Sequence, residues 1–242
     1  MLQEVAAKNL TERVAQNPYP GRGIVVGRAT DGSWIQVYWI MGRSENSRNR
    51  LFVCEDGILR TQAADPAKVE DPSLIIYHAM RTSGQRFIVS NGVQTDAIWR
   101  GLEAGSHFTD TLKDWHHEPD APNYTPRISG YIDLSGDRAL LWLSILKVSP
   151  FTIDEPERHF FRYESVDGGY GYAITTYMGD GDPLPSFSGS PYILGLPGNA
   201  DEIAAHFWQN LDADNKISLA VRHIDANSGR EQITIKNRYQ AV

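Results

Sequence analysis

Cysteine and long apolar runs are almost absent from this chain of 242 residues. The single cysteine, Cys54, excludes an internal disulfide and a multi-cysteine zinc site, as is typical of a protein in a reducing compartment. No run reaches the roughly 18 apolar residues that a membrane-spanning helix needs, and charged residues interrupt the first 16 positions, unlike the apolar core of a signal peptide. The sequence therefore predicts a cytoplasmic protein without a membrane segment.

A basic surplus is also missing. The chain has 23 Lys and Arg against 30 Asp and Glu, a net charge of -7, which argues against a dedicated nucleic-acid binder. Arginines are instead concentrated locally, because Arg43, Arg48 and Arg50 lie within eight residues among small polar neighbours. Charge runs are usually solvated, but this one joins two apolar stretches, and guanidinium groups suit phosphate or carboxylate. We therefore expect an anionic small-molecule ligand.

Turn signals and apolar alternation predict an α+β protein with mainly antiparallel strands rather than a doubly wound fold. Two sheets stacked face to face with helices outside satisfy the pattern, in a single domain covering residues 1–242. Its first 18 residues form an additional amphipathic helix. Further helices are expected over residues 95–104, 108–115 and 199–211. Hairpins are expected over residues 24–40, 51–60, 75–90, 127–147, 158–177 and 217–237.

The stretch from Ile75 to Ile98 is the most informative. It predicts two strands and then a polar cluster, residues 90–96, which opens a helix and gathers backbone N–H donors. A purely structural role for this cluster is also well supported, since a helix start needs a cap and Asn-Gly is a turn dipeptide. Thr95 or Asp96 is the expected cap, and Asp96 is also a candidate ligand group. Together with residues 43–50 and 123–128, this cluster predicts one site for an anionic, hydrogen-bonding molecule.

Taken alone, two candidate residues have an ordinary structural explanation. Tyr77 lies in an apolar strand, where an aromatic residue is usually part of the core. Glu118 follows His116 and His117, but consecutive His-His-Glu does not match a metal-binding spacing such as H-E-x-x-H. We therefore predict no metal site.

Several motifs together resemble the archaeal-type IMP cyclohydrolases. The resemblance covers most of the chain and is firmest over residues 19–132. The matching segments are Tyr19-Pro20-Gly21-Arg22, Val26-Gly27-Arg28, Asp31-Gly32-Ser33, Arg43-Ser44, Asn49-Arg50, Ile76-Tyr77, Val89-Ser90-Asn91-Gly92, Thr95-Asp96 and Thr125-Pro126-Arg127-Ile128.

The resemblance implies closure of 5-formamidoimidazole-4-carboxamide ribotide to IMP, with loss of water and without a metal or organic cofactor. It also implies a four-layer αββα sandwich similar to that of the N-terminal nucleophile hydrolases. The family's catalytic arginine, tyrosine and glutamate fall on Arg50, Tyr77 and Glu118, although the longer loop here leaves Arg48 as an alternative to Arg50.

We expect the remaining ligand contacts to come from residues beside these motifs, and a purine ribotide to be the partner. The oligomeric state stays open, including a homo-oligomer. The expected substrate-binding residues are Arg43, Asn91, Gly92, Asp96 and Arg127.

Two other functions remain open. An amide hydrolase on the same fold would need a Cys, Ser or Thr at the mature start of the first strand. That strand begins near Gly21-Arg22-Gly23, and Cys54 lies well inside the chain. The other alternative is a non-catalytic purine-nucleotide-binding protein that has kept the pocket.

Overall fold

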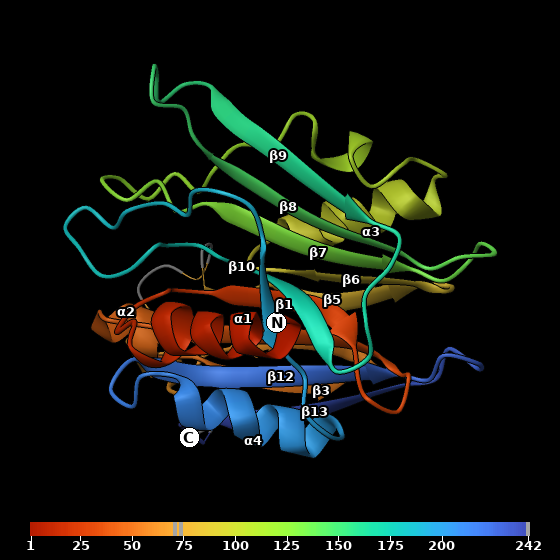
Figure 1. The fold of residues 1–242 in the computed structure, drawn as a ribbon. Helices are drawn as coiled ribbons and strands as arrows, with labels where there is room; N and C mark the ends of the chain where they lie inside the picture. The colour runs from red at the N-terminus through yellow and green to blue at the C-terminus, as the bar shows by residue number, and fades with distance from the viewer. Residues whose placement is uncertain (70–71, 73–74, 241–242) are drawn as a thin grey trace.

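Two antiparallel sheets lie face to face in the computed structural model, which describes residues 1–69, 72 and 75–240 (Figure 1). The first sheet has the strand order β11 (Tyr192–Gly195), β10 (Tyr170–Thr175), β1 (Gly23–Arg28), β2 (Trp34–Met41), β12 (Lys216–Ile224) and β13 (Glu231–Asn237). The second has the order β3 (Leu51–Glu55), β4 (Ile58–Gln62), β5 (His78–Ser83), β6 (Arg86–Ser90), β7 (Arg127–Asp133), β8 (Leu140–Val148) and β9 (Pro156–Tyr163). The predicted α+β class with stacked antiparallel sheets is confirmed.

Helices pack against both sheets. α1 (Leu2–Leu10) contacts β11, α4 (Ala200–Asn210) contacts β12 and β13, and α3 (Gln94–Glu103) contacts β5 and β6. Short helical segments complete the set: η1 (Thr11–Ala15), α2 (Glu45–Arg48), η2 (Pro66–Lys68) and η3 (Asp110–Leu112). No helix of the described residues is long and apolar enough to cross a membrane.

The two faces of β2 explain why its sequence is apolar almost throughout. Successive side chains of a strand point to opposite faces. Tyr38 contacts Phe52 of the other sheet, with ring centroids 5.4 Å apart, whereas Trp39 stacks on Phe207 of α4 at 5.9 Å. Both faces of β2 are therefore covered.

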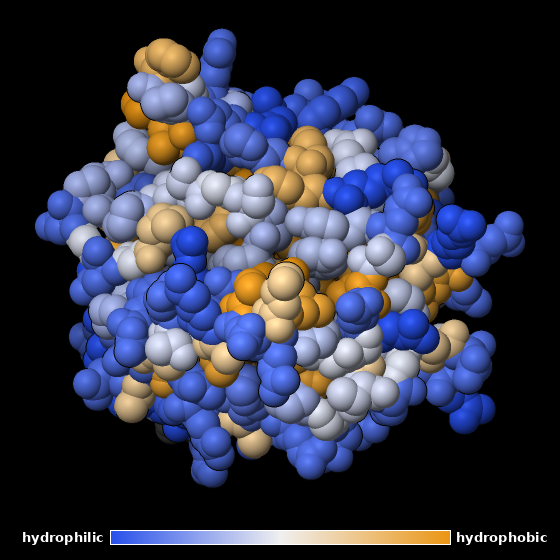
Figure 2. Space-filling model, viewed as in Figure 1, coloured by the Kyte–Doolittle hydropathy of each residue, from blue (hydrophilic) through white to orange (hydrophobic). Residues whose placement is uncertain are grey.

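One face of the molecule, the one that carries α1 and α4, is shown by hydropathy in Figure 2. Polar side chains cover most of it, and apolar ones gather in its middle, near the start of α1. Met1 and Val5 are among the exposed large apolar residues.

The hairpin predicted over residues 158–177 is wrong. β9 pairs with β8 in the second sheet, whereas β10 pairs with β1 and β11 in the first. The turn residues are present, and Gly169 has the expected positive φ of 86°, but the chain uses this turn to cross between the sheets. Tyr163 and Tyr172 stack at 3.6 Å instead of pairing in a ladder.

Smaller differences concern helix ends. α3 begins at Gln94 after Val93, without a side-chain cap, so the prediction that Thr95 or Asp96 caps it is wrong. The Thr95 hydroxyl donates to the Gly92 carbonyl at 3.0 Å. The helix expected over residues 108–115 is reduced to the single turn η3. Three elements, α2, η2 and β11, were not predicted.

Candidate active site

Polar segments from both sheets meet at one end of the sandwich. Antiparallel pairing sets Gly23, at the start of β1, opposite Trp39, near the end of β2, and Ser90, at the end of β6, opposite Ser129 of β7. The loops that precede β1, follow β2 and β6, and precede β7 therefore lie at the same end. These loops carry Arg22, residues 43–50, residues 90–93 and residues 118–126.

Arg22 and Glu118 form the central ion pair of this end. Arg22 donates two hydrogen bonds to the Glu118 carboxylate, each 2.9 Å long, and a third of 3.0 Å to the Asn91 carbonyl. Glu118 is 2% exposed. Burial alone lowers the pKa of Arg22, but the Glu118 carboxylate and nearby tyrosines raise it well above its ordinary value. Such bidentate, charge-assisted contacts fix geometry as well as charge.

Arg127 extends this ion pair. Its Nη1 lies 3.8 Å from Glu118 Oε1 and donates to Gln94 Oε1 at 3.0 Å. Burial lowers the pKa of Arg127, although the Glu118 carboxylate opposes the shift. One carboxylate therefore faces two guanidinium groups.

Two buried tyrosines face each other beside these charges. The hydroxyl groups of Tyr38 and Tyr77 are 2.6 Å apart. Burial, followed by the neighbouring Tyr77, raises the pKa of Tyr38 well above its ordinary value, even though Arg22 and Arg50 act in the opposite direction. Tyr38 is therefore a neutral phenol at physiological pH, and one of the two hydroxyl groups donates a hydrogen bond to the other.

Arg50 lines a cavity of about 230 Å³ that opens over this cluster, which we call the inner cavity. The Arg50 side chain is held by backbone carbonyls only, at 2.8 Å from Ser47 and 3.3 Å from Met41. The residues lining the inner cavity are Tyr19, Gly21, Arg22, Met41, Arg43, Ser44, Ser47, Arg50, Asp120, Asn123, Thr125, Tyr177 and Leu184.

Arg43 lies at the rim of the inner cavity. Its guanidinium lies over the Tyr19 ring, 5.0 Å from the centroid, pairs with Asp180 and donates to the Gly181 carbonyl at 3.1 Å. It is therefore a partly exposed cation whose carboxylate partner comes from a surface loop.

Asn91 and Gly92 hold the arginines in place. The Asn91 amide donates to the Pro126 carbonyl at 2.9 Å, and its oxygen accepts from the Ile128 N–H at 2.8 Å. A Cβ atom at Gly92 would lie 2.6 Å from Arg127 Nη1 and 2.7 Å from Gln94 Oε1, so a side chain there would displace the ends of both side chains. Glycine at this position therefore allows the loop to pack closely against Arg127.

Of the expected site residues, Arg43 and Arg50 line the inner cavity, Glu118, Arg127, Asn91, Gly92 and Tyr77 lie in the cluster around Arg22, and Asp96 lies elsewhere. Its carboxylate faces His78 at 2.9 Å and Arg81 at 2.8 Å, where α3 packs on β5. Arg48 also lies outside the inner cavity, so Arg50 rather than Arg48 reaches it. Among the described residues, no group of three or more His, Cys, Asp or Glu side chains gathers in a way that would hold a metal ion.

Sequence reasoning assigned no role to Arg22, Tyr38 or Tyr177. A signal existed for Arg22, which ends the Tyr19-Pro20-Gly21-Arg22 motif. Tyr38 lies in a strand-like apolar stretch and carries no local signal. Tyr177 belongs to Thr176-Tyr177, a weaker later match to the family, and its hydroxyl lies 2.5 Å from Thr125 Oγ1 in the structure.

The sequence matches a known family model over residues 19–229, described as IMP cyclohydrolase-like protein. That range includes every residue of the cluster described above. The chain belongs to the IMP cyclohydrolase-like family. The resemblance predicted from the motifs is therefore confirmed.

Three archaeal relatives named IMP cyclohydrolase support this membership. The protein of Methanopyrus kandleri is 31% identical over 172 residues, which cover 69% of this chain and 79% of the relative. That of Haloquadratum walsbyi is 29% identical over 121 residues, 48% of this chain and 58% of the relative. That of Methanothrix thermoacetophila is 32% identical over 130 residues, 52% and 62% respectively.

Proposed function

We propose that this chain is an IMP cyclohydrolase, which closes 5-formamidoimidazole-4-carboxamide ribotide to IMP and releases water in the last step of purine synthesis. The main observation is that Arg22 and Arg50 line one cavity, that Glu118 is bonded to Arg22, and that Tyr38 and Tyr77 lie close to these charges, in a chain of the IMP cyclohydrolase-like family. The names of the three archaeal relatives support the same activity.

The chemistry is an intramolecular addition followed by a dehydration. The carboxamide nitrogen attacks the formyl carbon, the C–N bond forms, and the electrons of the formyl C=O move to its oxygen. The resulting carbinolamine then loses its hydroxyl and one N–H proton as water, so that a C=N bond completes the ring. Because both reacting groups belong to one molecule, holding them in an attack-ready geometry supplies much of the acceleration.

Three side chains supply the hydrogen bonds, the charge stabilisation and the proton transfer that the reaction also needs. Tyr77 donates a hydrogen bond to the formyl oxygen as negative charge develops there, and Arg50 stabilises the same charge. Glu118 accepts the proton released by the amide and returns one to the departing hydroxyl. Arg22 and Arg127 hold that carboxylate in position, at 2.9 and 3.8 Å respectively.

The fold also supports the cyclohydrolase assignment. We propose that the sandwich is of the N-terminal nucleophile hydrolase type, because helices cover two stacked antiparallel sheets. The only cysteine, Cys54, is exposed in β3, away from the start of β1 where that class carries its nucleophile. A cytoplasmic location remains a prediction from composition.

A turnover assay tests the proposal. The purified protein is incubated with the formamido ribotide, IMP is followed by its absorbance, and Tyr77→Phe is compared with wild type. We expect turnover to fall by roughly 10²–10⁴-fold, the range for loss of a group that acts on a proton in the transition state. Tyr131→Phe is the matched control, since Tyr131 is also buried but donates to Asp133 at 2.8 Å in the second sheet.

The products separate this function from its alternatives. Release of formate from the ribotide would indicate an amide hydrolase, and a processed N-terminus detected by mass spectrometry would support that class. Tight binding of IMP without turnover of the precursor would indicate a binding protein. Either result overturns the cyclohydrolase assignment.

A further inference from the structure

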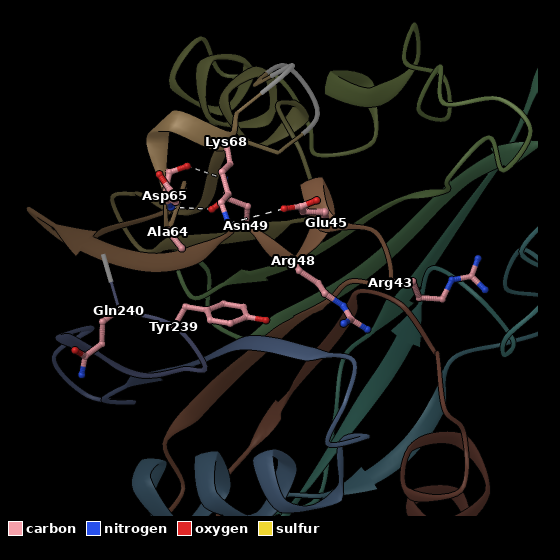
Figure 3. A pocket seen from close by; sticks show the side chains of 9 residues that line it. All are labelled: Arg43, Glu45, Arg48, Asn49, Ala64, Asp65, Lys68, Tyr239 and Gln240. Carbon is pink, nitrogen blue, oxygen red and sulfur yellow. Dashed lines mark hydrogen bonds and ion pairs between the residues drawn. The ribbon is translucent and has the colours of Figure 1, made fainter. Parts of the chain in front are cut away.

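A second cavity lies beside the inner one, on the other side of α2. This outer cavity has a volume of about 510 Å³ and is formed by α2, the segment around η2 and the residues that follow β13 (Figure 3). The side chains used below are Arg43, Glu45, Arg48, Asp65, Lys68 and Tyr239. They come from three parts of the chain that are far apart in the sequence, so the cavity is a product of the fold.

The charge of the outer cavity favours an anion. Arg43, Arg48 and Lys68 face it, against two carboxylates, Glu45 and Asp65. The Asp65 carboxylate accepts from the Ala67 N–H at 3.0 Å. The ion pair of Lys68 with Glu45 is 3.8 Å long and lies on the surface, where such pairs contribute little.

Among the three cations of the outer cavity, Arg48 stands out because its contacts are with neutral acceptors. Its Nε donates to the Gly42 carbonyl at 3.0 Å and its Nη2 to Asn215 Oδ1 at 3.2 Å. Within the described part of the chain, no carboxylate forms an ion pair with Arg48. Its positive charge is therefore fixed in place, half-buried and not compensated by a protein carboxylate. The Tyr239 ring extends toward it from the opposite wall (Figure 3).

α2 is a wall between the two cavities. Ser44 and Ser47 line the inner cavity, Glu45 and Arg48 line the outer one, and Arg43 lines both. The same short helix also fixes Arg50, through the Ser47 carbonyl at 2.8 Å. A molecule that reaches from one cavity to the other would therefore pass over Arg43.

The volume of the inner cavity indicates that the substrate makes this crossing. At about 230 Å³, the inner cavity is smaller than the 300–1,000 Å³ typical of small-molecule sites. It has room for the heterocycle with its two arms but not for the whole ribotide. A phosphate monoester is doubly charged near neutral pH, and Arg48, which forms no ion pair with a carboxylate of the described residues, lies across α2.

We propose that the outer cavity is a phosphate-monoester subsite, in which Arg48 and Lys68 bind the 5′-phosphate of the ribotide while its base occupies the inner cavity. This inference rests on the proposed function. Arg43, at the junction, contacts the ribose-phosphate portion in place of Asp180. A free phosphate or a second nucleotide would present the same anionic group to this cavity. The mode of inhibition by inorganic phosphate distinguishes these ligands from the substrate.

Kinetics of Arg48→Gln and Lys68→Gln test the proposal. For each variant we expect the KM for the ribotide to rise about tenfold while kcat stays within twofold, because a contact to a charged group is lost equally in the ground and transition states. The nucleoside that lacks the phosphate should be processed with the same kcat/KM by wild type and variants. Arg60→Gln is the matched control, since Arg60 is a surface arginine paired with Glu55 at 2.9 Å.

Inhibition by inorganic phosphate is the second test of the proposed subsite. We expect it to compete with the ribotide in wild type and to inhibit Arg48→Gln about tenfold more weakly. Non-competitive inhibition that both variants abolish would instead assign the cavity to a separate anion and overturn the substrate assignment. Normal KM values in both variants, with an active wild type, would overturn the subsite and leave the cyclohydrolase function standing.

A binding measurement keeps the two proposals apart. If wild type does not convert the ribotide, thermal stabilisation by inorganic phosphate still reports on the outer cavity. Stabilisation that is lost in Arg48→Gln and kept in Arg60→Gln would support an anion site in a protein that is not a cyclohydrolase, and equal stabilisation of all three proteins would reject the site.

Discussion

Two arginine–glutamate pairs, each with one buried partner, lie in different parts of the sandwich. Arg222 of β12 lies opposite Gln36 of β2, further from the site than Arg22. It is fully buried, 2.9 Å from Glu231, and donates to Gln36 Oε1 at 3.1 Å and to the Arg81 and Ile88 carbonyls at 3.2 and 3.3 Å. Arg22 and Glu118 are equally close, but the inner cavity opens over Arg22.

The electrostatic surroundings of the two arginines also differ. Burial lowers the pKa of Arg222, although Glu231 opposes the shift. The pKa of Arg22 rises, because a carboxylate and several phenols outweigh the same effect of burial. The Arg222–Glu231 pair links two neighbouring strands of one sheet and is enclosed there, whereas the Arg22–Glu118 pair lies beside a cavity among several phenols, as we expect for a pair that acts on a ligand.

Exchanging the glutamate of each pair for glutamine is expected to separate the two roles most strongly. Glu118→Gln should lower turnover by roughly 10²–10⁴-fold, since it removes the proposed proton acceptor. Glu231→Gln should leave turnover per folded molecule unchanged but destabilise the protein by about 3 kcal/mol, because breaking a buried pair leaves an uncompensated charge. Its melting temperature should fall by roughly 6–12 °C.

Kinetics and thermal denaturation of both variants measure these effects. Loss of turnover in Glu231→Gln at a temperature where it is folded would contradict the separation, as would full turnover in Glu118→Gln.

A smaller effect is expected for Tyr38→Phe, which tests how far the site extends beyond Tyr77. The change removes the hydroxyl that lies 2.6 Å from that of Tyr77. We expect kcat to fall roughly tenfold, equivalent to about 1.4 kcal/mol, which is the upper range for one hydrogen bond. Thermal denaturation checks that the fold is kept. A kcat equal to that of wild type would show that Tyr77 acts without its partner.

The smallest effect is expected for a third carboxylate–guanidinium pair, Asp96 with Arg81 on the outer side of β5. Burial alone raises the pKa of Asp96, but hydrogen bonds from Arg81 and His78 outweigh it and lower the pKa below its ordinary value of 3.8. The ionised form therefore stabilises the folded protein above pH 3.8, and this stabilisation is lost as the pH falls through the lowered pKa.

Asp96→Asn should accordingly cost about 1 kcal/mol at pH 6, since the pair is partly exposed. The difference from wild type should shrink below pH 4. Urea denaturation at several pH values measures it, and a constant difference down to pH 3 would reject the proposed pairing energy.

The sequence predicted the hairpins well because their signals are local. Dipeptides such as Asp31-Gly32 and Ser83-Gly84 occur between apolar stretches, and both form turns between paired strands. The same local signal at Gly168-Gly169 failed, because a turn sequence does not specify whether the next strand joins the same sheet. That choice depends on strand edges formed by residues far away in the chain.

The proposed site was predictable only in part, for a similar reason. Arg50, Tyr77 and Glu118 were proposed from motifs, whereas Tyr38 was noticed only through its contact with Tyr77. Asp96 lies in a motif yet faces His78, because the helix that follows Gly92 turns its side chain to the outer side of β5. Proximity in sequence did not predict on which side of the sheet a side chain lies.

The strand order of the first sheet has a consequence for how the enzyme matures. The β1–β2 hairpin, which borders the candidate site, lies between β10 and β12, strands that begin at Tyr170 and Lys216. Both neighbouring strands are therefore synthesised long after the hairpin, and pairings over such long separations form slowly. We expect the site to be complete only after β12 has been synthesised, because until then one edge of β2 has no partner strand.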